Sequence, residues 1–394
     1  MSSLPPTVRR LGLVSLLTDA SSEMIYPLLP SFLTGTLRAS PEFVGLVEGL
    51  AESVASLLKM ASGWISDHLP RRKPLIVGGY TLSSLARPLV ALATSPWHVL
   101  AVRVADRIGK GVRGAPRDAL VAQVTPPADL GRAFGFHRAM DHAGAVVGPL
   151  LASAVLLARD DLRLVFALAA LPALASVLVL VFGVKDAPAR TTPAAARSAS
   201  PEPTHAATPA GPGPRRFLAV IGLFTLGNSS DAFLLLRAQQ AGVSLALVPL
   251  LWTAHHVVKS AASTAGGALS DRVGRRVTIA GGWCLYAAAY AGLGLATRAW
   301  QVWALFAVYG LHHALTEGPE RALIADLATG ERRGRAFGLY HAITGGLLLP
   351  ASLLTGALWQ RYSPGVALLT GAAIALAAAV ALLMVVPEPA RVRG

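Results

Sequence analysis

The sequence predicts an all-α membrane protein of twelve transmembrane helices, arranged as two homologous six-helix halves. Three observations carry this prediction: an apolar composition, a series of apolar stretches of membrane-spanning length, and an internal repeat. The 394 residues are 53% hydrophobic and only 14% charged, whereas soluble domains average about 25% charged residues. The composition therefore excludes an ordinary soluble enzyme or binding domain.

Eleven apolar segments have the length of about 20 residues that is needed to cross a bilayer. They lie at residues 10–34, 43–65, 75–95, 134–158, 162–184, 217–241, 245–269, 277–297, 300–327, 335–360 and 364–386. The Pro-, Ala-, Ser- and Thr-rich segment 186–216 is predicted to be a disordered linker. It separates an N-terminal half, residues 1–185, from a C-terminal half, residues 217–394.

An internal repeat supplies the twelfth span. Residues 116–139 and 319–342 match at an offset of 203, and both contain Gly-Arg-Ala-Phe-Gly. Residues 63–72 and 267–276 match at an offset of 204. Two pairs of similar segments at nearly the same offset indicate two homologous halves. Because 300–327 is apolar enough to span, its partner 97–123 is predicted to span as well, despite its charge.

The stretch 102–118, which reads VRVADRIGKGVRGAPRD, lies inside this predicted twelfth span. At helical spacing, Arg103, Arg107, Lys110 and Arg117 form one stripe. A charge at the bilayer centre costs at least about 2.5–3.5 kcal/mol, so the stripe must face the protein interior or a wet cavity. A cytoplasmic amphipathic helix is the alternative that this stretch alone leaves open.

The distribution of Lys and Arg predicts the orientation. Of the 35 basic residues, nineteen lie at the two termini, in the even-to-odd connections and in the linker, and five lie in the opposite loops. This asymmetry predicts that both termini and the linker of this multi-pass protein are cytoplasmic. The excess of Arg over Lys and the abundance of Ala are typical of bacteria with GC-rich genomes, so a bacterial inner membrane is expected. The net charge of +14 comes from these short clusters, so no nucleic-acid partner is expected.

Residues 267–276 contain a Gly, an Asp and a basic cluster in fixed spacing. The positions concerned are Gly267, Asp271, Arg272, Gly274, Arg275 and Arg276. The first-half copy keeps Gly63, Asp67, Arg71 and Arg72, but has His68 and Pro70 where the second copy has Arg and Gly. Two six-helix halves, a long middle loop and this motif after the second and eighth spans resemble the major facilitator superfamily of secondary transporters, over the whole chain.

The resemblance implies a transporter, and no enzyme, that moves a small solute by alternating access. It also implies that the motif aspartates pair with arginine across the cytoplasmic side and hold one state shut. Gly144, Gly148 and Pro149 form a Gly-x-x-x-Gly-Pro sequence that is similar to the antiporter motif of this superfamily. Generic packing of small residues between helices is the alternative for these three positions.

Charged side chains within the spans are the candidate substrate and proton sites. They are Asp19, Glu23, Arg103, Asp106, Arg107, Lys110, Asp141, Asp231 and Glu317. Asp19 and Glu23 share one helix face, and we expect one of them to pair with Arg103 or Arg107 and to take a proton when the cavity rearranges. Static ion pairs are the alternative. The spacing of the histidines and the single Cys284 suggest neither a metal site nor a cofactor.

These features favour a monomeric, proton-coupled secondary transporter of a small anionic or zwitterionic solute. Efflux by antiport is favoured because of the Gly148-Pro149 motif, with protons and the lipid bilayer as further partners. Proton-coupled uptake of an organic anion or a chelated metal is an alternative within transport. A membrane enzyme or a sensor that does not transport is an alternative from another class, which no nucleophile motif or phosphate loop supports.

Overall fold

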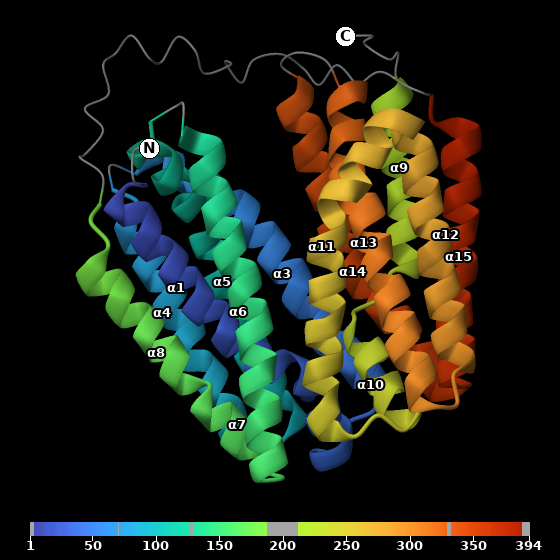
Figure 1. Cartoon of the computed structure of the whole chain (residues 1–394), viewed down its shortest axis with the longest axis horizontal. Helices are drawn as coiled ribbons and strands as arrows, with labels where there is room; N and C mark the ends of the chain where they lie inside the picture. The colour runs from blue at the N-terminus through green and yellow to red at the C-terminus, as the bar shows by residue number, and fades with distance from the viewer. Residues whose placement is uncertain (1–3, 70, 127–128, 187–211, 329–331, 388–394) are drawn as a thin grey trace.

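The computed structural model describes residues 4–69, 71–126, 129–186, 212–328 and 332–387. Within these ranges the chain forms helices, turns and short connections, and the twelve predicted spans all appear as helical segments (Figure 1). The first half contains α1 (Pro6–Ile25), η1 (Tyr26–Leu28), α2 (Leu29–Ser31), η2 (Phe32–Thr36), α3 (Pro41–His68), α4 (Lys73–Ala86), η3 (Arg87–Leu92), α5 (Pro96–Val124), α6 (Leu130–Ala158), α7 (Leu162–Leu168), α8 (Ala170–Leu178) and η5 (Val179–Gly183). The second half contains α9 (Pro212–Gly227), α10 (Ala232–Gln240), η7 (Leu245–Leu247), α11 (Val248–Val273), α12 (Arg275–Leu295), α13 (Ala299–Leu327), α14 (Arg332–Arg361) and α15 (Pro364–Val385). Most of the predicted linker, residues 187–211, lies outside the described residues.

Seven of the described segments are long and apolar enough to cross a membrane by length and composition alone. The charged stretch is not one of them, yet α5 runs unbroken over 29 residues and buries Arg103, Arg107 and Arg113. The internal repeat therefore predicted a helix that apolar content alone does not reveal.

Three helices begin with the same pair of residues, a serine followed by proline. Ser40, Ser95 and Ser363 accept backbone N–H hydrogen bonds at the starts of α3, α5 and α15, at 3.2, 3.3 and 3.1 Å. Serine satisfies an otherwise unpaired N–H at a helix start, and proline fits the first helical position because it has no N–H to lose. This local sequence determines where each of these helices starts.

The seventh span is broken, although the sequence analysis treated it as one segment. The polar run Asn228–Asp231 separates α9 from α10, because such residues hydrogen-bond the backbone in non-helical conformations. Tyr286 Oη donates to the carbonyl of Gly227 at 2.8 Å, which satisfies one acceptor that the break leaves free.

The two halves meet along α3 and α14, and also where α6 approaches α11 (Figure 1). Gly45 and Gly49 lie directly against the α14 backbone at Ser352 and Leu349. Ser53 Oγ donates to the Gly345 carbonyl at 2.8 Å. The start of α1 and the end of α15 lie at one end of the molecule, and there the two halves stand apart (Figure 1). The contacts between the halves lie toward the opposite end.

Equivalent contacts in the two halves revise the register of the repeat. Arg72 donates to Ser66 and Gln123 at 3.2 and 2.6 Å, and Arg275 donates to Ser270 and Asp326, both at 3.2 Å. The structural partner of Arg275 is therefore Arg72, at an offset of 203, and not Arg71 as the sequence match at 204 suggested. The alignment of the two halves shifts by one residue here because α4 and α12 match at an offset of 203, as residues 116–139 and 319–342 do.

Gly144 and Gly148 lie on the face of α6 that packs against α1, and Pro149 is buried next to them in the same helix. A Cβ added at Gly144 would meet the carbonyl of Leu16, and one added at Gly148 would meet the carbonyl of Ala20. The two glycines therefore allow a close backbone approach between α1 and α6. This geometry accounts for the glycines by packing alone.

We expect Gly148→Ala to lower the free energy of unfolding by about 1–3 kcal/mol, because the added methyl overpacks the α1–α6 contact. Gly135→Ala, in the same helix but with no atom within 4 Å of its added Cβ, is expected to raise it by up to about 1 kcal/mol. Thermal unfolding in detergent measures both. Shifts of the same sign would contradict the packing role.

Candidate functional site

A cavity of about 420 Å³ lies between the two halves. Most of its wall comes from the first half, and α11 contributes His256 and Lys259. Eight basic and four acidic residues line it: Lys59, Arg87, Arg107, Lys110, Arg113, Arg117, Arg138 and Lys259, with Asp19, Glu23, Asp118 and Asp141. The wall is therefore strongly polar, with an excess of positive charge.

Arg103 and Asp106 of α5 belong to a buried network of ion pairs. Arg103 binds both carboxylate oxygens of Glu48 on α3, at 3.0 and 2.6 Å. Asp106 accepts from Arg87 at 2.7 Å and lies 3.7 Å from Arg103. All four side chains are 6% exposed or less. These residues hold α3, the α4–η3 segment and α5 together and do not present free charge to a solute.

Arg107 lies on the cavity wall but is also paired. Its guanidinium contacts Glu52 at 2.9 Å and Asp106 at 3.6 Å. The expected pairing of Arg103 or Arg107 with Asp19 or Glu23 is not formed in this structure, because Glu48 and Glu52 on α3 occupy both arginines. Their spacing of four residues matches the spacing of the two arginines on α5.

Lys110 is the next residue of the stripe, one turn after Arg107, and its side chain is exposed to the cavity. Among the described residues it has no hydrogen-bond or ion-pair partner within 4 Å. Asp19 on α1 lines the same cavity, packs over Gly144 and interacts electrostatically with Lys110 and Asp141. The stripe thus includes an ammonium group that a ligand can reach.

Glu23 connects the two halves. Its Oε2 accepts a hydrogen bond from Trp252 Nε1 of α11 at 2.8 Å, and the Trp252 ring packs against Tyr26 with centroids 5.4 Å apart. This bond joins α1 of the first half to α11 of the second. Any movement that separates these helices breaks it.

The other candidate acids have local partners. Asp141 accepts from Ser15 and lies 3.4 Å from His137 and 3.8 Å from Arg138. Asp231 accepts from Tyr309 Oη at 2.5 Å. Glu317 contacts Lys259 at 2.5 Å and His313 at 3.4 Å. Only Asp141 of these three lines the described cavity.

The motif at residues 267–276 forms contacts within its own half. Arg275 contacts Asp271 at 2.5 Å and Asp326 at 3.2 Å, and Arg276 donates to the carbonyls of Val386 and Leu383 at 2.6 and 2.7 Å. Gly274 has φ of +116° and ends α11, a conformation that glycine adopts without strain.

The remaining motif positions have different surroundings. Arg272 is exposed in the last turn of α11, Gly267 faces open space, and Gly63 packs against Ala115 of α5. Arg71 is exposed, and the side chain of Asp67 lies outside the described part of the structure. For Asp271, the expected pairing across the halves is not seen among the described residues, where its partner is Arg275 of the same half.

Glu320 has a distinctive environment that the sequence analysis did not single out as a site. It is buried and accepts from Trp283 Nε1 at 3.1 Å and from Tyr340 Oη at 2.9 Å. At the offset of 203, its counterpart in the first half is Arg117. A charge of opposite sign at equivalent repeat positions is the signal that identifies it. No group of three or more metal-ligating side chains occurs in the ranges the structure describes.

The sequence pattern of the Major Facilitator Superfamily matches residues 11–236 and 216–394. The chain belongs to this superfamily. It is 32% identical over 393 residues to the uncharacterized MFS-type transporter MJ1317 of Methanocaldococcus jannaschii, which covers 97% of this chain and 95% of that protein. It is 33% identical over 156 residues, 38% of this chain and 39% of the relative, to the multidrug resistance protein MdtH of Photorhabdus laumondii.

Solved structures of the superfamily share the fold. A bacterial homologue of the human lysosomal transporter Spinster, in an inward-facing and unoccupied conformation, superimposes with a TM-score of 0.70 at 17% identity, covering 98% of this chain and 96% of that one. The predicted twelve-helix fold in two halves is confirmed. The chain is a multi-pass membrane protein with the fold of superfamily transporters.

Proposed function

We propose that this superfamily member is a proton-coupled transporter that exports a small zwitterionic solute in exchange for protons. The observation that carries the proposal is the exposed Lys110, which has no partner among the described residues and lines the cavity between the halves together with Asp19. A cation and an anion that line one cavity can bind the two charged groups of one zwitterion. The proposal places the protein in a bacterial inner membrane as a monomer, with both termini and the 186–216 linker in the cytoplasm.

Lys110 is assigned the anionic group of the solute. The arginines around it are engaged: Arg107 with Glu52, Arg113 with Ser83 and the Tyr80 ring, and Arg117 with Asp118. A solute anion would have to displace these contacts, and displacing Arg107 would leave the Glu52 carboxylate without its partner. Lys110 has three N–H donors and no such partner among the described residues, so a solute anion binds there without breaking an existing contact.

Asp19 is assigned the cationic group of the solute, in competition with a proton. A carboxylate cannot hold a proton and an ammonium group at the same time, so the two species exchange. Glu23 is assigned the coupling to the conformational change, since its bond to Trp252 exists only while α1 and α11 are in contact. Export is the direction that the name of the multidrug resistance protein MdtH suggests. Exchange rests on the resemblance of the Gly148-Pro149 sequence to the antiporter motif, beside the packing role of Gly148.

Uptake of an anion together with a proton is the second candidate, and the excess of basic residues in the cavity favours it. An anion without an amine would compete with Asp19 for Lys110. Protonation of Asp19 would then favour anion binding, so that solute and proton move in the same direction. The two candidates differ in the direction of proton flux.

A thermal-shift screen of the purified protein, using amino-acid-like zwitterions and their deaminated analogues, tests the proposal. We expect the zwitterions to stabilise the protein, and Lys110→Gln to weaken their binding by about tenfold or more, because one charge-assisted contact is lost. Lys110→Arg keeps the charge, and Arg138→Gln removes an exposed charge that lies 3.8 Å from Asp141; both should change the affinity by less than about threefold.

Proteoliposomes loaded with a pH-sensitive dye then report the direction of proton flux that accompanies a stabilising compound. Proton entry during solute exit supports exchange, and parallel movement supports the second candidate. Equal stabilisation of wild type and Lys110→Gln would show that the solute binds elsewhere.

Asp271→Asn is expected to slow transport severalfold while changing the free energy of unfolding by less than about 1 kcal/mol, since exposed ion pairs contribute little stability. The physical reason is that a gate contact shifts the equilibrium between states without building the solute site. Asp67→Asn should slow transport less, because its copy of the motif is incomplete. Solute flux in proteoliposomes measures both.

Asp326→Asn is the matched control, since Asp326 also contacts Arg275 but lies outside the motif. It should leave transport near the wild-type rate. Equal slowing in Asp271→Asn and Asp326→Asn would attribute the effect to the position of Arg275 and would remove the case for a gate.

A further inference from the structure

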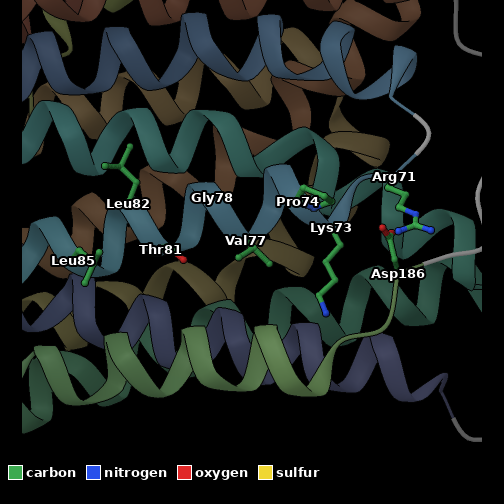
Figure 2. A pocket seen from close by; sticks show the side chains of 9 residues that line it. All are labelled: Arg71, Lys73, Pro74, Val77, Gly78, Thr81, Leu82, Leu85 and Asp186. Atoms are coloured by element: carbon green, nitrogen blue, oxygen red, sulfur yellow. The ribbon is translucent and has the colours of Figure 1, made fainter.

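A groove of about 920 Å³ runs along the outer face of α4, on the side of the first half away from the central cavity (Figure 2). It begins at the loop before α4 and at the chain just after η5, and it continues along α4 as far as Leu85. Its lining residues are Arg71, Lys73, Pro74, Val77, Gly78, Thr81, Leu82, Leu85 and Asp186. One end is charged and the remainder is almost entirely apolar.

The charged end contains two cations and one carboxylate. Figure 2 shows the guanidinium of Arg71 facing the carboxylate of Asp186, and the amine of Lys73 pointing toward η5. Lys73 Nζ donates one hydrogen bond, to the carbonyl of Val181, at 2.9 Å. An ammonium group has three N–H donors. Among the described residues Lys73 uses one of them, so two N–H donors remain for a ligand.

The apolar part has the character of a surface that contacts hydrocarbon. Leu82 and Leu85 are 40% and 58% exposed, and Lys73–Leu92 is one of the segments apolar enough to cross a membrane. A Cβ added at Gly78 would have no atom within 4 Å. The glycine therefore leaves room in the groove that neighbouring side chains do not fill.

The second half differs at the equivalent place. At the offset of 203, Lys73 corresponds to Arg276, which spans two carbonyls at the end of α15, those of Val386 and Leu383. Arg276 therefore ties α12 to the last helix of its half through two hydrogen bonds, whereas Lys73 makes one. Arg71 has no counterpart in this arrangement, because Arg72 occupies the position of Arg275.

We infer that this groove binds one anionic phospholipid, with its phosphate at Lys73 and Arg71 and an acyl chain along Val77, Gly78 and Leu82. The two cations exceed the single carboxylate, so the charged end has a net positive charge that matches one phosphate. Asp186 can accept a hydrogen bond from a headgroup hydroxyl, as in phosphatidylglycerol. Basic residues at the end of a membrane helix attract anionic headgroups. The site is independent of the solute site between the halves.

Native mass spectrometry of the purified full-length protein, titrated with phosphatidylglycerol, tests the inference. We expect Lys73→Gln and Gly78→Leu to weaken binding of the first lipid by about fivefold or more, by loss of the charge and by filling of the groove. Gly281→Leu is the matched control, because Gly281 is the counterpart of Gly78 on α12 and also has no atom within 4 Å of an added Cβ.

Separate titrations compare phosphatidylglycerol, phosphatidylethanolamine and phosphatidylcholine with identical acyl chains. Wild type should bind phosphatidylglycerol about fivefold or more tightly than either of the others, and Gly281→Leu should behave as wild type. Melting of the lipid-free variants at the wild-type temperature shows that each is folded. Equal binding of the three lipids, or wild-type affinity in both Lys73→Gln and Gly78→Leu, would overturn the site.

Discussion

Arg103→Met is expected to lower the free energy of unfolding by about 3–5 kcal/mol, the effect of leaving a buried charge without its partner. The substitution removes both hydrogen bonds to Glu48, at 3.0 and 2.6 Å, and leaves that carboxylate buried. It also removes one of the cations beside Asp106. The loss of stability is measured as the shift in thermal unfolding of the protein in detergent, with lipid content held constant.

Two further variants separate charge from packing. Arg103→Met combined with Glu48→Met removes the unpaired carboxylate and should recover most of the lost stability, as replacing both members of a buried pair by apolar groups often does. Arg107→Met should be milder, because its partner Glu52 is 36% exposed and reaches solvent. If the double variant were no more stable than Arg103→Met, the loss would come from helix packing and the ion-pair explanation would fail.

The sequence predicted the fold well because its two signals are physically strong. Apolar length is required of any segment that crosses a bilayer, and the repeat fixed the position of α5 where apolar content could not. The break at Asn228–Asp231 was not predicted. A hydroxyl from a distant helix, that of Tyr286, hydrogen-bonds the carbonyl of Gly227 beside it, and such tertiary support is not visible in the local sequence.

The partners of the charged stripe were harder to predict, for a geometrical reason. Asp19 and Glu23 on α1 are four residues apart, and so are Glu48 and Glu52 on α3. Either pair matches Arg103 and Arg107, which have the same spacing, so the sequence alone does not choose between them. The rotation of α3 about its axis decides the pairing, because it places Glu48 and Glu52 against α5. The same pairing leaves Asp19 and Glu23 free for other roles.

Lys110 illustrates what the sequence could and could not reveal about the site. Its place in the stripe predicted that it faces the cavity, and the structure places it there. That it lacks a partner among the described residues follows only from the positions of the acids around it. The site is therefore defined by which charges are already neutralised, a property of the packed helices.

Glu23→Gln is expected to abolish transport driven by a pH gradient, reducing it by more than about tenfold, equivalent to 1.4 kcal/mol. Glutamine keeps an oxygen that can accept from Trp252 Nε1 but cannot take up a proton. Counterflow of the solute should persist, because exchange of labelled for unlabelled solute needs the alternating movement without net proton transfer. Both are measured in the same proteoliposomes, with and without an imposed pH gradient.

Trp252→Phe is the matched variant on the other side of the bond. It removes the 2.8 Å hydrogen bond but keeps the carboxylate, so proton-driven transport should continue with an altered dependence on pH. The hydrogen bond between Trp252 and Glu23 is present only while α1 and α11 are in contact. Separation of these helices frees the Glu23 carboxyl group, so the change of state and proton exchange at Glu23 are linked. Wild-type rates of pH-driven transport in Glu23→Gln would exclude this coupling and direct attention to Asp19, Asp141 and the buried Glu320.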